Sequence, residues 1–190
     1  HVRSRRQRQM CIRDRCEKIT DGEHLSPNYV EIGFPILSAK DILAYGIDFS
    51  GAKQVSELDF TKMLKRCNPE FGDVLIVSRG ATIGKTTLNI SAKAFALMGS
   101  VILLKPNKMR CLGSYLSYLI AQTEIQNQML SLSGSSAQQA IYLKDIKEMR
   151  LLLPPIAEQE IISKSINSVD QKIVACSNKL DALILSLIHI

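Results

Sequence analysis

The chain has 190 residues, of which 46% are hydrophobic and 22% are charged. This length is sufficient for one ordinary domain with a further element attached, and the apolar fraction can supply a core. Its apolar runs are all shorter than the ~20 residues that a membrane-spanning helix needs. The arginine-rich start is not followed by the apolar stretch of a secretory signal. We therefore expect no membrane partner and no secretion.

Cysteine and histidine usage indicates a reduced protein without a metal. The five cysteines are scattered and form no Cys-x-x-Cys pair, and their number is odd. This pattern favours free thiols and a cytoplasmic protein. The histidines are only His1, His24 and His189, and none pairs closely with a cysteine. We expect no metal site and no cofactor.

The net charge of +6 is concentrated in residues 1–15, which contain six arginines and one aspartate, so the rest of the chain carries only +1. Overall charge is therefore a weak indication of nucleic-acid binding. Physically, residues 1–15 are expected to be a solvated, unfolded basic arm that could hold phosphates in a salt-dependent manner. They also resemble translated sequencing-adapter sequence, as do residues 185–190. We expect both ends to be non-native and leave them out of the functional interpretation.

Short apolar runs between turn residues predict a mixed domain over residues 16–155. Strands are predicted at 73–78, 101–104 and 149–153, where aliphatic residues are bounded by Gly or Pro. Their separation by polar, turn-rich segments indicates that the domain contains both helices and sheet, which is a mixed α/β (α+β) fold class.

Two helices are predicted inside this domain. Ser56 with Asp59 resembles a capping box and predicts a short helix through Arg66. A longer helix is predicted over Ser114–Leu130. Its inner face is expected to carry Leu116, Leu119, Ile120 and Met129.

A heptad pattern begins after Pro154-Pro155 and predicts a long C-terminal helix at 156–184. Apolar residues step alternately by four and three over about 33 Å of helix. This seam consists of Ile162, Ile166, Val169, Ile173, Cys176, Leu180 and Leu183. A strict 3.5-residue period favours a partner helix, as in a coiled coil. The alternative is an amphipathic helix that folds back on its own domain.

The segment Gly80–Thr86 follows a predicted strand and suggests a phosphate-binding loop. That loop needs four residues between its glycines, and here Gly80 and Gly84 are separated by three. A glycine-rich turn between two strands is therefore the favoured interpretation, and nucleotide hydrolysis is the disfavoured one.

Other catalytic patterns are also incomplete. Asn68–Phe71 resembles the Asn-Pro-Pro-Phe motif of adenine-N6 methyltransferases, but Glu70 replaces the second proline and no glycine-rich loop for S-adenosylmethionine is found. A simple turn is the alternative. His24 is isolated, and no Ser, His and acidic set can be proposed from spacing. We expect no catalytic residue in this chain.

Several segments in order resemble the specificity subunit of type I restriction–modification systems. They are Thr20–His24, Gly33–Ser38, Gly72–Ile76 with Gly80 and Gly84-Lys85, Gly134–Gln138 with Ile141 and Leu143, and Leu153–Pro155 with Glu158-Gln159 and Ile162. The resemblance covers about residues 16–184. It implies a target recognition domain at 16–155 followed by a spacer helix.

The resemblance also implies partners. Subunits of this family carry two recognition domains, each reading one half of a split DNA site, separated by long paired helices. Methyltransferase (M) subunits that hold S-adenosylmethionine and a restriction (R) subunit dock on them. This chain has one recognition domain and one helix, which is expected of a half-sized subunit that dimerises or of a fragment of a longer subunit.

Reading bases requires polar side chains on loops, and five such residues are candidates. They are Arg79, Thr82, Lys85, Gln138 and Gln139. Ordinary surface polarity is the alternative for each. The sequence thus predicts a non-catalytic module that binds double-stranded DNA. The alternatives are a stand-alone adenine-N6 methyltransferase, a nucleotide hydrolase, and a coiled-coil dimeric DNA-binding regulator.

Overall fold

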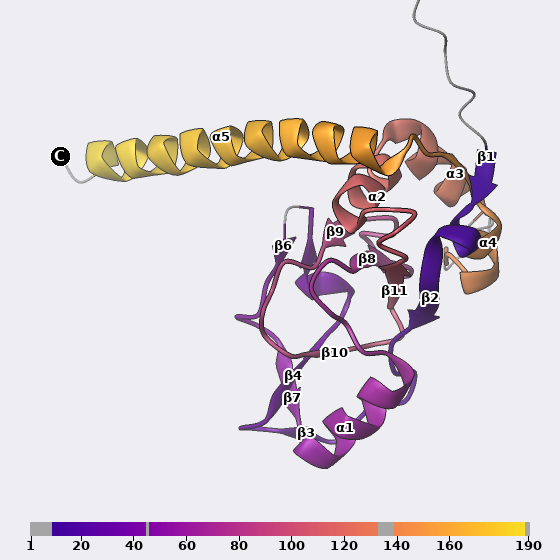
Figure 1. Cartoon of the computed structure of the whole chain (residues 1–190). Helices are drawn as coiled ribbons and strands as arrows, with labels where there is room; N and C mark the ends of the chain where they lie inside the picture. Colours follow the sequence, from indigo (N-terminus) through magenta and orange to yellow (C-terminus); the bar gives the residue numbers. More distant parts are fainter. Residues whose placement is uncertain (1–8, 45, 133–138, 189–190) are drawn as a thin grey trace, which may run out of the picture.

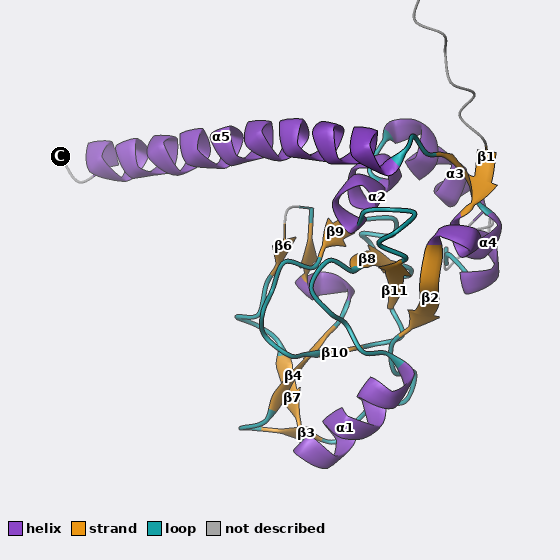
Figure 2. Ribbon diagram, in the orientation of Figure 1, coloured by secondary structure: helices purple, strands orange, loops and turns teal. Residues whose placement is uncertain are grey.

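The computed structural model describes residues 9–44, 46–132 and 139–188. Figure 1 shows a mixed α/β body with the helix α5 projecting from it, and Figure 2 separates helices from strands. The strands are β1 Gln9–Cys11, β2 Cys16–Asp21, β3 Tyr29–Val30, β4 Phe34–Leu37, β5 Ile42–Leu43, β6 Gly46–Ile47, β7 Lys53–Val55, β8 Val74–Val77, β9 Thr86–Leu88, β10 Ala96–Leu97, β11 Val101–Pro106 and β12 Arg150–Leu152. The helices are α1 Glu57–Arg66, α2 Gly113–Ile120, α3 Thr123–Leu132, α4 Leu143–Glu148 and α5 Ile156–Ile188, with 3-10 turns η1 Ile12–Arg15 and η2 Ala39–Asp41.

The central sheet has the strand order β2-β11-β8-β9. Strand β11 lies between β2 and β8 and is antiparallel to both, so β2 and β8 run in the same direction. Ile102 at the start of β11 lies opposite Asp21 in β2 and Ile76 in β8. Consequently β2 and β8 end at the same end of the sheet, beside the start of β11.

The central sheet is covered on both faces. Side chains alternate along a strand, so Ile102 and Leu104 pack in one cluster while Val101 and Leu103 pack in another. The first cluster lies against the helices and includes Leu116, Ile120, Met129 and Ile146. The second lies against loops and the other sheet and includes Leu37, Ile42, Phe95 and Leu97. Each fully buried aliphatic side chain stabilises the fold by roughly 1.5–3 kcal/mol.

A second sheet, with the order β10-β4-β7-β3, packs against α1. The rings of Phe34 in β4 and Phe60 in α1 stack at 4.3 Å. Helix α1 begins as predicted, because the Ser56 side chain accepts a hydrogen bond of 3.2 Å from the Asp59 backbone N–H. The strands predicted at 73–78, 101–104 and 149–153 are confirmed as β8, β11 and β12.

The single helix predicted over Ser114–Leu130 is wrong, since the structure has two helices, α2 and α3. The side-chain amide of Gln126 donates a hydrogen bond of 2.9 Å to the Ile120 carbonyl. This carbonyl is at the end of α2, where the hydrogen bonds within the helix stop, so Gln126 supplies a partner for it. The inner face was predicted correctly, because Leu116, Leu119, Ile120 and Met129 are all buried.

The residues before β2 take part in the fold. Strand β1 pairs antiparallel with β12, and Ile12 is 1% exposed in the helix-covered cluster. The expectation of a solvated, unfolded arm is therefore wrong for residues 9–15, while residues 1–8 lie outside the described part of the chain. Helix α5 likewise continues past residue 184, where we expected the spacer helix to end.

The first turns of α5 are anchored to the domain. Gln159 is 0% exposed, accepts a hydrogen bond from the Leu112 backbone N–H at 3.0 Å, and donates to the Pro154 carbonyl at 2.8 Å. Burial and a hydrogen bond with Asp170 raise the pKa of Tyr118 in α2 to about 12. The helix therefore docks on α2 over its first half, as far as Asp170, and its later part extends away from the domain (Figure 1).

Along the heptad seam, Ile162 and Ile166 are half-buried. The exposed members are Val169, Ile173, Cys176, Leu180 and Leu183. The whole helix spans about 50 Å. Across the described residues, no helix combines the length and apolarity needed to cross a membrane.

Gly22 should be essential for folding, because it packs directly on the backbone of Leu97. A Cβ at Gly22 would overlap the Leu97 carbonyl, which is backbone and cannot move aside cheaply. We expect Gly22→Ala to lower the free energy of unfolding by roughly 2–4 kcal/mol. The matched control is Gly51→Ala, whose nearest neighbour is the Lys40 Nζ at 3.9 Å. Urea denaturation should show almost no change for the control, and equal stability of the two variants would contradict this packing.

Candidate nucleic-acid interface

The segment from Ser78 to Thr86 is a tight connection between the antiparallel strands β8 and β9. Gly80 and Gly84 have φ angles of +101° and +83°, which favour glycine. The Gly84 N–H donates to the Val77 carbonyl at 2.8 Å, and the Val77 N–H donates to the Lys85 carbonyl at 2.8 Å. A strand, not a helix N-terminus, follows this turn. The structure therefore supports the predicted glycine-rich turn and not a phosphate-binding loop.

Two other segments hold this turn. Arg79 forms an antiparallel bridge with Ala140, and the Ile141 N–H donates to the Ser78 carbonyl at 2.9 Å. On the other side, the Gln126 side-chain amide donates to the Gly84 carbonyl at 3.0 Å. The bridge brings Arg79 beside the chain that follows Gln139, although the two residues are far apart in sequence.

The candidate DNA-contact residues thus gather around one turn. Arg79 and Gln139 are exposed, whereas Thr82 and Lys85 are half-buried. Gln138 lies outside the described residues. Four of the five candidates are therefore placed on neighbouring backbone segments, and the structure does not test whether any of them contacts DNA.

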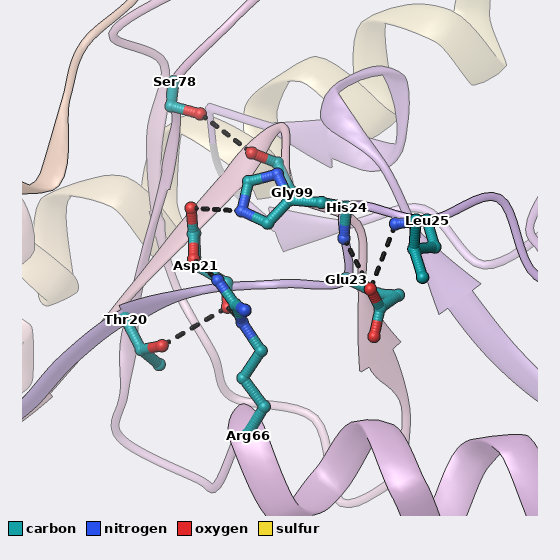
Figure 3. Close-up of polar contacts among 8 residues, drawn as sticks. All are labelled: Thr20, Asp21, Glu23, His24, Leu25, Arg66, Ser78 and Gly99. Carbon is teal, nitrogen blue, oxygen red and sulfur yellow. Dashed lines mark hydrogen bonds and ion pairs between the residues drawn. The ribbon is translucent and has the colours of Figure 1, made fainter.

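The segment Thr20–His24 forms a polar network at the end of β2 (Figure 3). One Asp21 carboxylate oxygen lies 2.8 Å from His24 Nε2, and the other accepts a hydrogen bond of 2.6 Å from Arg66 of α1. This hydrogen bond raises the pKa of the Arg66 guanidinium. Glu23 accepts hydrogen bonds from the backbone N–H groups of His24 and Leu25. The loop after β2 is therefore rigidly held to α1.

A cleft of about 500 Å³ opens where β2 and β8 end and β11 begins. Its walls include His24, Tyr29, Lys40, Lys53, Arg79 and Ser100. The acidic residues at its edge already have partners. Asp41 is buried and accepts hydrogen bonds from the Ser38 N–H and hydroxyl at 2.8 and 2.9 Å. Asp41 also lies 4.0 Å from Lys40 Nζ, and the lining as a whole has three cations, Lys40, Lys53 and Arg79, against the two carboxylates of Glu23 and Asp41.

Sequence analysis missed most of this cleft. Lys40 and Lys53 lie in separate short elements with no recognisable spacing, and His24 was noted only as an isolated histidine. The one available signal was Thr20–His24, which was noted for its family resemblance and not for a site. Of the predicted DNA-contact residues that the structure describes, Arg79 alone lines the cleft.

The methyltransferase-like segment Asn68–Phe71 is a turn. The Asn68 amide donates to Glu70 at 3.1 Å, and the Glu70 N–H donates to Asp73 at 2.8 Å. Both carboxylates pair with Lys105, at 2.9 and 3.1 Å. Burial lowers the pKa of Lys105, but these two pairs outweigh it and the net shift is upward. The segment therefore closes a local ion-pair network.

The cysteines are free, and two of them are deeply buried. Burial raises the pKa of the Cys67 and Cys111 thiols to about 12, which keeps them protonated and unreactive. In the part of the chain that the structure describes, no three His, Cys, Asp or Glu side chains gather closely enough to hold a metal ion.

Comparison with known proteins assigns the chain to a family. The profile described as "Type I restriction modification DNA specificity domain" matches residues 27–185. The chain belongs to this family. A putative type I restriction enzyme MjaX specificity subunit of Methanocaldococcus jannaschii is 26% identical over 176 residues, which are 90% of this chain and 41% of that protein. The specificity-domain chain thus spans about two fifths of that relative's length.

Solved structures share the fold of this specificity domain. The HsdS subunit from Thermoanaerobacter tengcongensis matches with a TM-score of 0.65 at 20% identity, over 92% of this chain and 41% of that one. The type I restriction–modification S subunit from M. genitalium matches with a TM-score of 0.63 at 14% identity, over 92% and 42%. The predicted fold class, a mixed α/β domain followed by a long helix, is confirmed.

The turn should depend on both of its glycines, but to different degrees. Gly80→Ala adds only backbone strain, because a Cβ at Gly80 has no neighbour within 4 Å. Gly84→Ala adds the same strain and places a Cβ 2.6 Å from Gln126 Oε1, which displaces that amide. We expect losses in the free energy of unfolding of about 1 kcal/mol for Gly80→Ala and about 2 kcal/mol for Gly84→Ala. Calorimetry measures both, and equal losses would rule out a stabilising role for Gln126.

Proposed function

We propose that this chain is the DNA-reading part of a type I restriction–modification specificity subunit, and that it binds duplex DNA in a sequence-specific manner. The observation that carries the proposal is the cationic end of the central sheet in a chain of the DNA specificity family. There Arg79 and Gln139 are exposed on adjoining backbone segments. Such a surface offers planar donors and acceptors to base edges in the major groove.

Each candidate residue is assigned a contact that suits its side chain. Arg79 presents a guanidinium for guanine, and Gln139, with Gln138 beside it in sequence, presents an amide for adenine. Thr82 lies in the turn and Lys85 at its base, where a lysine suits phosphate better than a base edge. Contacts to phosphate position the domain on DNA, and contacts to base edges select the sequence.

The proposed function includes no catalysis by this chain. Its phosphate-loop and methyltransferase-like segments are both turns held by local hydrogen bonds. We therefore propose that methyl transfer and cleavage belong to M and R subunits that dock on the specificity subunit, and that the complex acts in the cytoplasm. Purified chain should show neither methyl transfer nor nucleotide hydrolysis. Co-purification with an M subunit is the direct test, and either activity in the isolated chain would contradict the proposal.

The proposed role of α5 is to pair with another helix and set the distance between two recognition domains. Beyond its anchored start, the seam exposes Val169, Ile173, Leu180 and Leu183 to solvent. Covering each such side chain is worth roughly 1.5–3 kcal/mol, so a partner helix is favoured. The partner is a second copy of this chain or the second half of a longer subunit. Family resemblance favours antiparallel pairing.

Base reading predicts two different responses to substitution. Arg79→Ala or Gln139→Ala should weaken binding to the preferred duplex by roughly 1–3 kcal/mol and leave binding to unrelated duplexes nearly unchanged. Lys85→Ala should weaken all duplexes to a similar extent. Fluorescence anisotropy with preferred and scrambled duplexes measures both quantities. If none of these variants changes affinity for the preferred duplex, the turn is not the reading surface.

Helix pairing can be tested with two isoleucines of similar exposure. Ile173 is 61% exposed on the seam, and Ile161 is 67% exposed off it. Ile173→Asp should abolish self-association or assembly with M subunits, since it places a charge in the paired interface. Ile161→Asp is the matched control and should assemble normally. Analytical ultracentrifugation gives the oligomeric state and circular dichroism the folding. Unfolding of the Ile173→Asp domain would place the seam in the core and refute the spacer role.

A further inference from the structure

We infer that the cleft at the end of the central sheet is an anchor for a backbone phosphate of duplex DNA, formed by Lys40 and Lys53 beside the base-reading Arg79. The inference rests on the proposed function and assigns the sequence-independent part of binding to residues that the motif analysis did not identify. Lys40 lies in η2, Lys53 in β7 and Arg79 in the turn after β8, so these cations meet only in the folded domain.

The charge balance of the cleft supports an anionic ligand. Two carboxylates line the cleft: Glu23 accepts hydrogen bonds from two backbone N–H groups, and the buried Asp41 accepts from Ser38 and lies 4.0 Å from Lys40 Nζ. Among the described residues, no carboxylate lies within ion-pair distance of Lys53 or Arg79. Positive charge that is not neutralised by the protein itself attracts an anion, and duplex DNA presents one phosphate about every 1.7 Å along its axis.

The walls of the cleft are held in place before any ligand binds. Lys53 Nζ lies 4.1 Å from the centre of the Tyr29 ring, and Lys40 Nζ donates to the Gly51 carbonyl at 3.2 Å. The Asp21 carboxylate, shared with Arg66, holds His24, which also lines the cleft (Figure 3). A preformed site loses little conformational entropy on binding. Lys40 and Lys53 are therefore held by contacts within the domain before a ligand binds.

The position of the cleft explains why its ligand would be backbone and not base. Lysine is a compact point charge that suits phosphate, whereas base edges are read by planar amide and guanidinium groups. Arg79 lies at the border between the cleft and the proposed reading turn. A phosphate held beside Arg79 would fix the register of the duplex and bring its base edges to the turn.

The test uses the full chain with Lys40→Ala, Lys53→Ala and the double substitution. Lys65→Ala is the matched control, because Lys65 is an exposed lysine that does not line the cleft. Affinities for preferred and scrambled duplexes are measured over a series of salt concentrations. Each cleft variant should weaken both duplexes equally, by roughly three- to tenfold at about 0.1 M salt, and reduce the slope of log K against log salt by about 0.9. Lys53→Arg, which keeps the charge, should restore most of the affinity.

Two results would contradict the proposal that the cleft anchors a backbone phosphate. One is a loss confined to the preferred duplex, which would make these lysines base readers. The other is a salt slope for Lys53→Ala equal to that of Lys65→Ala while the unsubstituted chain still prefers its site. An unsubstituted chain that shows no preference for any duplex contradicts the proposed function instead, so the two failures are distinguishable. Thermal melting of each variant checks that removing an exposed lysine leaves the domain folded.

Discussion

The packing of β11 between β2 and β8 is the constraint on which the rest of the molecule depends. Val101–Leu104 are buried on both faces, so this strand joins the two main core clusters and has antiparallel partners on both edges. Because both partners run opposite to β11, they end together. Asp21 and Ser78, distant in sequence, therefore emerge at one end of the sheet, and the cleft forms there.

The chemistry of that end follows from which charged groups already have partners within the fold. Asp21, Glu23 and Asp41 accept hydrogen bonds from neighbouring groups and so are committed to structure. Lys53 and Arg79 have no carboxylate partner of this kind in the described residues. A domain that is almost neutral outside its first fifteen residues can thus present a local positive surface. Local field, more than net charge, decides which ligand such a surface attracts.

Helix α5 combines two roles that are separated along its length. Its start is part of the domain, because the buried Gln159 satisfies backbone groups of Leu112 and Pro154 that would otherwise lack partners. Farther along, Ile173 and Leu180 face solvent. A rigid helix that is anchored at one end and exposes an apolar stripe at the other is suited to hold a second body at a set distance.

The sequence by itself determined the features that depend on local pattern. Aliphatic runs predicted β8 and β11, Ser56 predicted the start of α1, the spacing of Gly80 and Gly84 predicted a turn, and the heptad predicted a long helix. These succeed because hydrophobic period, capping and φ preference act within a few residues. The order of loose motifs also identified the family.

Tertiary structure alone decided the features that depend on contacts between distant segments. The break between α2 and α3 needs Gln126 beside Ile120, and the burial of Ile12 needs β12. Both were predicted wrongly, because the residues themselves carry no breaking or strand signal. The cleft is the clearest case: Lys40 and Lys53 meet Arg79 only because η2 and the second sheet pack beside the end of the central sheet where β8 stops. No spacing along the chain could indicate that meeting, since it is set by packing between segments that are distant in sequence.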